Sequence, residues 1–183
     1  MIFSSIPNLL TVFRFFLVYP IIISILEENF HLTLFFFFLA GISDFLDGFL
    51  ARKFLWESKF GKVFDPVSDK VLVIATLISL SLIGEINIYL TVFLLSRDLF
   101  IIVGVILSSL LLENYEIKPT FSGKFNSFVL MTFLGFVIIK VTFDFVPAGF
   151  LNFLMVALLF TSIYSVIEYL IFPGRKVISQ IFF

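Results

Sequence analysis

Four aspartates carry the strongest chemical signal in this sequence. Asp44 and Asp47 stand close together in the segment GISDFLDGFLAR, and Asp65 and Asp69 follow in GKVFDPVSDKV. A helix turns about 100° per residue, so each pair falls on one side of its own helix. If the two helices are antiparallel neighbours, the four carboxylates face one another, and the few basic residues nearby do not offset their repulsion. Hard divalent cations resolve that conflict, and oxygen ligands without His or Cys favour Mg²⁺ or Mn²⁺.

The composition places these charges in a membrane protein. Of the 183 residues, 61% are hydrophobic and only 14% are charged, whereas a soluble domain is about one quarter charged. Intrinsic disorder is excluded because such chains are poor in apolar residues. The net charge of −1 provides no field that would attract nucleic acid, so we expect no nucleic-acid partner. The absence of cysteine excludes disulfides, thiolate nucleophiles and Cys-bound metals.

Six stretches are apolar and long enough to cross a bilayer as helices, which requires about 20 residues. They run approximately over residues 8–26, 31–50, 64–83, 88–112, 126–141 and 150–172. The short connections leave no linker, so we expect one compact all-α membrane domain over residues 1–183. No removable leader is expected, because the first six residues carry no basic charge.

Lysine and arginine in the connections indicate the orientation. They occur after the second, fourth and sixth stretches and are absent from the other three connections. The positive-inside rule then predicts that both termini face the cytoplasm, with the aspartates on the same side. We expect a bacterial inner-membrane protein whose active site faces the cytoplasm. The basic residues concerned are Arg52, Lys53, Lys59, Lys62, Lys118, Lys124, Arg175 and Lys176.

Small residues share the helix faces of the aspartates. Gly48 and Ala51 fall on the side of Asp44, and Gly61 falls on the side of Asp65. Together they open a gap beside the proposed metal site, at the level of the lipid headgroups. This gap suits a lipid with a diphosphate, whose oxygens metal ions would bridge while a hydroxyl attacks in line. One carboxylate could accept the hydroxyl proton, so the pattern predicts phosphoryl transfer on a lipid.

The same residues form a recognisable motif. The pattern DxxDGxxAR, eight residues and then GxxxDxxxD resembles the signature of the CDP-alcohol phosphatidyltransferase family. Eight fixed residue types at fixed spacing match a given start by chance on the order of once in 10¹⁰. The resemblance extends to the opening IPNLLTVFR and to the six-span layout. The motif residues are Asp44, Asp47, Gly48, Ala51, Arg52, Gly61, Asp65 and Asp69.

The resemblance implies a role for each motif position. The carboxylates matching Asp44, Asp47 and Asp65 would hold two Mg²⁺ or Mn²⁺ ions, and Asp69 is the candidate base and could also bind metal. The remaining positions would bind CDP-diacylglycerol: Gly48 and Ala51 beside the cytidine, Arg52 near the nucleotide phosphates, Asn8, Thr11 and Arg14 at the diphosphate, and Gly61 in the same site. Members of the family usually form homodimers, so a homodimer is expected here.

Arg97 and Asp98 lie deep within the fourth stretch, where ionisable residues need a partner or a function. One interpretation is a structural ion pair, although adjacent helical residues face each other poorly. The other is that Arg97, together with Lys124, binds the phosphate of the acceptor.

The acceptor is expected to be a glycerol-based alcohol. The opening IPNLLTVFR and the small size favour glycerol 3-phosphate, which gives phosphatidylglycerophosphate. The segment IKPTFSGKFN favours the alternative, a cardiolipin synthase that uses phosphatidylglycerol.

A remote alternative is a cation or solute transporter, because membrane carboxylates also mark ion pathways. A transporter is expected to distribute its charges through the membrane and to show paired repeats, and the sequence shows neither pattern.

Overall fold

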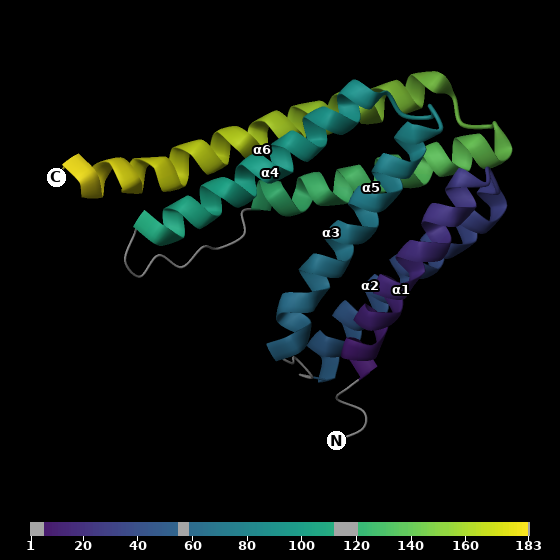
Figure 1. Ribbon diagram of the computed structural model, residues 1–183, viewed down its shortest axis with the longest axis horizontal. Coiled ribbons are helices and arrows are strands. Elements are labelled where there is room, and N and C mark those ends of the chain that lie inside the picture. Colours follow the sequence, from purple (N-terminus) through teal and green to yellow (C-terminus); the bar gives the residue numbers. More distant parts are fainter. Residues whose placement is uncertain (1–5, 55–58, 112–120, 183) are drawn as a thin grey trace. The chain divides into compact units, whose positions relative to one another are not determined.

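The computed structural model describes residues 6–54, 59–111 and 121–182, and it describes side chains over most of these ranges. In these ranges the chain forms six helices and no strand (Figure 1), which confirms the predicted all-α fold. The helices are α1 (Ile6–Leu26), α2 (Phe30–Phe54), α3 (Lys59–Leu82), α4 (Ile88–Leu111), α5 (Phe121–Phe143) and α6 (Ala148–Phe182).

The helices are longer than several of the apolar stretches that predict them. α3 begins at Lys59 rather than at residue 64, and α6 continues to Phe182 rather than ending at residue 172. Lys124, expected in a connection, lies in the first turns of α5. The difference arises because hydropathy marks only the part of a helix that lies in hydrocarbon, whereas the backbone hydrogen bonds continue into the polar layer.

Four helices are long and apolar enough to span a membrane, judged on their described residues. These segments are Leu9–Leu26 in α1, Phe30–Asp47 in α2, Ser122–Phe143 in α5 and Ala148–Tyr169 in α6. The expected spans in α3 and α4 are not among them and remain predictions; α3 begins with several charged residues. The chain is an integral membrane protein.

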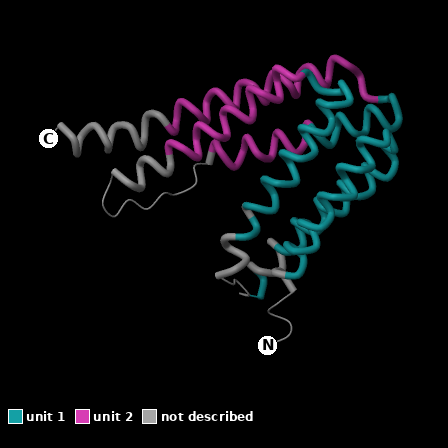
Figure 2. Tube along the Cα trace, in the orientation of Figure 1, with its two compact units in different colours: residues 1–87, 134–145 teal, residues 88–133, 146–183 magenta. Residues whose placement is uncertain are grey.

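The chain divides into two compact units, which Figure 2 draws in different colours. Unit 1 comprises residues 1–87 and 134–145, and unit 2 comprises residues 88–133 and 146–183. Helix α5 therefore contributes its first half to unit 2 and its second half to unit 1.

In unit 1, α1 packs against both α2 and α3 (Figure 1). A tight turn reverses the chain between α1 and α2: Glu28 has a positive φ of 56°, and the side chain of Asn29 accepts the backbone N–H of Leu32 at the start of α2. Gly84, just after the end of α3, also has a positive φ, of 86°, which is common where a helix ends. The buried core between these helices includes Ile21, Ile25, Ala40, Leu72, Leu77 and Leu80.

In unit 2, α4 packs against α6. Polar side chains connect α6 to the first half of α5, because Asn126 accepts hydrogen bonds from Thr161 (2.9 Å) and Ser162 (2.8 Å). Such bonds between helices are the usual polar contacts in apolar surroundings.

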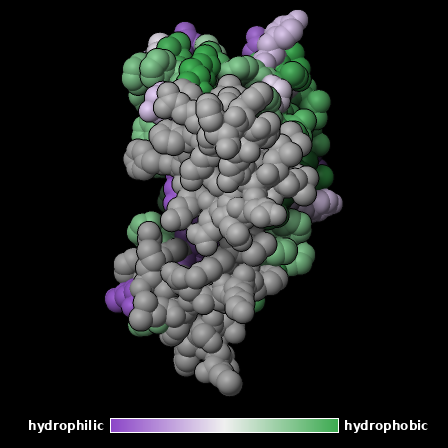
Figure 3. All heavy atoms as spheres, turned by 90° about the vertical axis from the view of Figure 1, so that its left-hand side faces the viewer, coloured by the Kyte–Doolittle hydropathy of each residue, from purple (hydrophilic) through white to green (hydrophobic). Residues whose placement is uncertain are grey.

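Large hydrophobic side chains cover the outer surface of both units. Phe16 and Tyr19 in unit 1 and Phe160 in unit 2 are each at least 70% exposed. On the face drawn in Figure 3, most of the described residues that are visible are hydrophobic. An exposed apolar surface of this kind is expected where lipid replaces water as the solvent.

Candidate active site around Arg14

Arg14 lies at the centre of the acidic cluster of unit 1. Its side chain is 2% exposed and uses all three nitrogens. Nη1 contacts Asp69 and lies 3.0 Å from a carboxylate oxygen of Asp44, while Nη2 donates to Asp47. Nε donates to the hydroxyl of Ser43 at 3.4 Å. One guanidinium from α1 thus joins carboxylates of α2 and α3.

The cluster is buried on one side and open on the other. Asp47 is 6% exposed, whereas the side chains of Asp44 and Asp69 are 44% and 45% exposed. A ligand from outside can therefore reach Asp44 and Asp69 without unfolding the helices. The inner partner, Asp47, needs Arg14 because an unpaired carboxylate is costly at this depth.

Asp65, the fourth carboxylate, meets α1 through a different residue. The fully buried Thr11 donates its hydroxyl to a carboxylate oxygen of Asp65. Thr11 lies three residues before Arg14, so both face the same side of α1. Asp65 and Asp69 likewise lie one turn apart on α3. This matching of spacings lets two residues of α1 bind two carboxylates of α3.

The donor set of this cluster fits a hard divalent cation. Its acidic groups are all carboxylates, and three of them contact one positive group, the guanidinium of Arg14. Four aspartates and one arginine leave three formal negative charges in a small volume. Within the described part of the chain, however, no three Asp, Glu, His or Cys side chains are gathered into a ready metal site. Arg14 lies between them instead, so their role as metal ligands stays a prediction.

Five predicted nucleotide-binding residues lie outside the residues whose side chains are described. They are Asn8 in α1, Gly48, Ala51 and Arg52 in α2, and Gly61 in α3. The geometry of the cluster therefore does not test the roles predicted for these five residues.

Arg97 and Lys124, the predicted acceptor residues, belong to unit 2. Arg97 is 7% exposed and forms an ion pair with Asp98, and its Nη2 donates to Ser165 of α6 at 2.6 Å. Arg97 and Asp98 thus form the ion pair of the first interpretation, even though they are adjacent in the sequence. The Nε of Arg97 is buried without a hydrogen-bond partner. Lys124 is exposed on α5.

Two polar contacts were missed by sequence reasoning. Ser43 accepts from Arg14 in unit 1, and Glu168 of α6 accepts from Ser122 of α5 in unit 2. Glu168 could have been noticed, because an acidic residue within an apolar stretch usually has a partner. No comparable signal marks Ser43, since serine is common in membrane helices.

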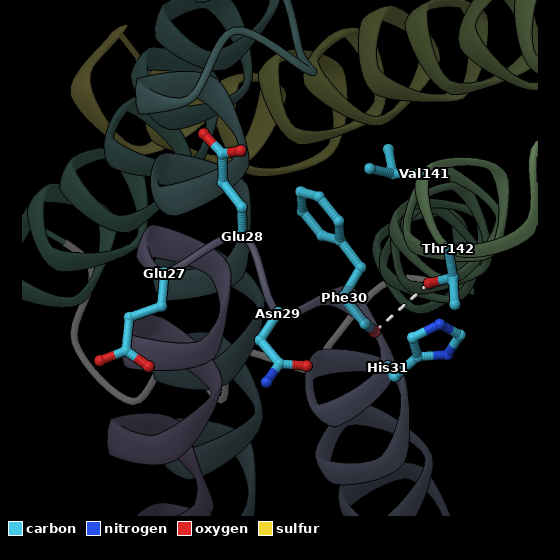
Figure 4. Close-up of a pocket in the computed structure, with 7 residues that line it drawn as sticks. All are labelled: Glu27, Glu28, Asn29, Phe30, His31, Val141 and Thr142. Atoms are coloured by element: carbon cyan, nitrogen blue, oxygen red, sulfur yellow. Dashed lines mark hydrogen bonds between the residues drawn. The ribbon is translucent and has the colours of Figure 1, made fainter.

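A pocket of about 360 Å³ lies at the opposite end of the α1–α2 hairpin. In Figure 4, Thr142 of α5 points toward the start of α2, where its hydroxyl donates to the carbonyl of Phe30 at 3.3 Å. Asp44 is fourteen residues further along α2, about 20 Å away at the rise of a helix. The pocket is therefore separate from the acidic cluster. Its lining residues are Glu27, Glu28, Asn29, Phe30, His31, Val141 and Thr142.

The fold and the cluster define a helical membrane protein with an acidic site shared by its first three helices. The sequence matches the CDP-alcohol phosphatidyltransferase family model over residues 4–167, so the chain belongs to that family. This confirms the resemblance that the motif predicted. Members of the family are generally dependent on divalent metal ions, and they act on CDP-alcohols in membranes.

Enzymes with different names are among the curated relatives of this chain. The chain is 33% identical to the cardiolipin synthase (CMP-forming) of Rattus norvegicus over 97% of its own length and 64% of the relative's, so it spans less than two thirds of that protein. It is 34% identical to a CDP-diacylglycerol–glycerol-3-phosphate 3-phosphatidyltransferase of Aquifex aeolicus, over 75% of this chain and 78% of the relative. The enzyme of the same name from Haemophilus influenzae is 31% identical over 91% of both chains.

Proposed function

We propose that this protein transfers the phosphatidyl group of CDP-diacylglycerol to a hydroxyl of glycerol 3-phosphate. The products are phosphatidylglycerophosphate and CMP, which makes the reaction a step of phospholipid biosynthesis. The observation that carries the proposal is the gathering of Asp44, Asp47 and Asp69 around Arg14 in a member of this family. Two relatives named for this reaction match the chain, one of them over 91% of both lengths.

Asp44, Asp47 and Asp65 are the proposed ligands of two Mg²⁺ or Mn²⁺ ions, with Asp69 as a fourth ligand. When bound, such ions neutralise the charge that develops on the departing CMP and align the phosphate oxygens. The exposed side chain of Asp44 leaves room for a metal ion to approach.

Asp69 is the proposed general base. The acceptor hydroxyl oxygen forms a bond to the phosphorus that carries the diacylglycerol, and the bond from that phosphorus to CMP breaks. The hydroxyl proton passes to the Asp69 carboxylate, and CMP leaves with the bonding electron pair. Half of the Asp69 side chain is exposed, so an acceptor can approach it, and its contact with Arg14 fixes its position.

The donor lipid is proposed to bind along α1 and the adjoining ends of α2 and α3. Thr11 and Arg14 are buried donors on one face of α1 and could meet the diphosphate of the nucleotide. Asn8, Gly48, Ala51, Arg52 and Gly61 complete the proposed CDP-diacylglycerol site on the resemblance of the motif alone.

Arg97 and Lys124 are the proposed ligands of the acceptor phosphate. The buried guanidinium of Arg97 has an unpartnered Nε, which leaves one donor for an incoming oxygen atom. Lys124 is exposed and can add a second positive charge.

A cardiolipin synthase is the second candidate. It is favoured by the match to the rat enzyme of that name, which covers 97% of this chain. In that reaction phosphatidylglycerol would replace glycerol 3-phosphate as the acceptor, and the chemistry at Asp69 would be unchanged.

The working protein is proposed to be a homodimer in the bacterial inner membrane. We infer that both termini and the acidic cluster face the cytoplasm, where CDP-linked substrates and glycerol 3-phosphate are dissolved or accessible. All 183 residues are proposed to act as one catalytic domain.

Separating the lipid products identifies the acceptor that the enzyme uses. Purified protein receives labelled CDP-diacylglycerol with glycerol 3-phosphate, phosphatidylglycerol, serine or inositol in turn, and the lipids are separated by thin-layer chromatography. We expect a phosphatidylglycerophosphate band with glycerol 3-phosphate. A cardiolipin band with phosphatidylglycerol and no product with glycerol 3-phosphate would move the assignment to the second candidate.

A further inference from the structure

In unit 2, a carboxylate lies one helical turn from the guanidinium of Arg97. Ser165 of α6 accepts a hydrogen bond from Arg97 of α4 at 2.6 Å, and Glu168 of α6 accepts one from Ser122 of α5. Ser165 and Glu168 are three residues apart, so their side chains are neighbours on the helix, about 5–6 Å apart at the Cβ atoms. A positive group and a negative group therefore lie side by side along α6.

Glu168 lies near the polar end of its helix. It stands in the last two turns of the apolar stretch of α6, and Ser122 precedes the apolar stretch of α5, which begins at about residue 126. The exposed Lys124 marks the same end of α5. Glu168 itself is half-buried, so a water-soluble molecule can reach its carboxylate.

Both charged groups have capacity for a further hydrogen bond. Within the described part of the chain, Glu168 is paired through Oε2 with Ser122, and no second donor there is paired with Oε1. Arg97 is 7% exposed, and its Nε has no partner. A carboxylate binds a hydroxyl donor and a guanidinium binds a phosphate, each through strong charge-assisted bonds. The pair suits a molecule whose phosphate and hydroxyl are separated by a few bonds.

A purely structural role does not require the charge of Glu168. Polar bonds between helices do stabilise membrane proteins. One turn deeper, however, the neutral amide of Asn126 connects α5 to α6 through Thr161 and Ser162. A carboxylate within an apolar stretch is more costly than an amide, which indicates a function for Glu168.

We infer that Glu168 determines acceptor specificity: its carboxylate accepts a hydrogen bond from the secondary hydroxyl of the glycerol acceptor, whose phosphate Arg97 binds. This inference rests on the proposed function, since it needs a glycerol-based acceptor. Glycerol 3-phosphate and the headgroup of phosphatidylglycerol both carry this hydroxyl, so the contact serves either candidate acceptor.

The test compares two acceptors in CMP release from CDP-diacylglycerol by the purified protein with Mg²⁺. 3-Hydroxypropyl phosphate keeps the phosphate and the attacking primary hydroxyl of glycerol 3-phosphate but lacks the secondary hydroxyl. We expect the wild type to prefer glycerol 3-phosphate at least about tenfold in kcat/KM, because a hydrogen bond to a charged group is lost with the analogue.

Variants of Glu168 should remove this preference. Glu168→Met keeps the length of the side chain without its oxygens, and the ratio of the two kcat/KM values should fall to about one. Glu168→Gln keeps a neutral acceptor and should give an intermediate ratio. A structural role would instead lower kcat/KM for both acceptors by the same factor and leave the ratio unchanged.

Ser162→Ala is the matched structural control. It removes a buried hydrogen bond between the same two helices, so the protein should melt at a lower temperature and keep the wild-type ratio.

A wild-type ratio near one, or a ratio unchanged in Glu168→Met, would overturn the role of Glu168 and leave the proposed reaction intact. Glu168→Gln decides in the same way if Glu168→Met does not fold. If the wild type uses phosphatidylglycerol instead, phosphatidyl-1,3-propanediol is the matching analogue. A folded wild type that releases no CMP with either glycerol acceptor would overturn the proposed function together with this inference.

Discussion

Asp47 of α2 and Asp69 of α3 are bound by the same guanidinium, through Nη2 and Nη1 of Arg14 respectively. The two aspartates come from different helices, and one is buried while the other is half exposed. Their shared partner brings a protected carboxylate and an accessible one to a common point. This division suits a site in which one carboxylate anchors a cation and the other meets substrate.

Replacing the proposed base should stop the reaction without emptying the nucleotide site. In Asp69→Asn the amide cannot accept the hydroxyl proton, so CMP release should fall about 10²- to 10⁴-fold, the usual contribution of general base catalysis. The dissociation constant for CDP, measured by calorimetry with Mn²⁺, should change little. Asp144→Asn, an equivalent change after α5, should keep full activity. Unchanged turnover in Asp69→Asn would remove this residue from the base role.

Removing the hydroxyl of Thr11 should weaken catalysis through Asp65. Thr11→Val keeps the shape of the side chain but leaves the Asp65 carboxylate without this donor. We expect a loss of stability of about 1.5–3 kcal/mol, since a hydrogen bond to a charged group is lost, together with a clear fall in CMP release.

Thr33→Val is the matched control for Thr11→Val. Thr33 is also fully buried in unit 1, but its hydroxyl bonds to Ser24 at the other end of the hairpin. Both variants should melt at lower temperature in detergent, and only Thr11→Val should lose activity. Equal losses of activity would show that Thr11 acts through folding alone.

Chelation should abolish turnover reversibly. Dialysis against EDTA is expected to stop CMP release, and added Mg²⁺ or Mn²⁺ should restore it, because oxygen-only ligands favour these ions. Circular dichroism should show an intact helical protein throughout, since Arg14 still joins the three helices. Full activity in the chelated protein would contradict a metal-dependent mechanism.

Arg97→Lys should affect the acceptor and not the donor. Lysine keeps the charge but loses the fork that contacts Asp98 and Ser165, and it has no Nε–H to offer. We expect the KM for glycerol 3-phosphate to rise about tenfold, which is the loss of about 1.4 kcal/mol of binding. The KM for CDP-diacylglycerol should stay the same. A rise in both constants would indicate a structural role for the Arg97–Asp98 pair.

The motif spacing was sufficient to predict which carboxylates share a helix face. Asp44 with Asp47, and Asp65 with Asp69, follow from helical periodicity, and the short connection indicates that the two helices are neighbours. The apolar stretches likewise predicted the number and order of the helices, although their polar ends were underestimated. These features are local, so a single sequence contains them.

The partner of the carboxylates could not be predicted in the same way. Periodicity places Thr11 and Arg14 on one face of α1, but it does not say that this face turns toward Asp65 and Asp69, more than 50 positions away. The few basic residues near the motif do not offset the repulsion between the carboxylates, whereas the buried Arg14 of the first helix offsets part of it. The hydrogen bond from Ser162 to Asn126 could not be predicted for the same reason, since 36 positions separate the two residues.

The most direct test of the proposed reaction is CMP release by purified protein in detergent, measured with Mg²⁺ and each substrate alone or together. We predict that CMP and phosphatidylglycerophosphate appear in equal amounts only when CDP-diacylglycerol and glycerol 3-phosphate are both present. Folded protein that forms no CMP with any glycerol-based acceptor, and instead carries Mg²⁺ into sealed vesicles, would contradict it.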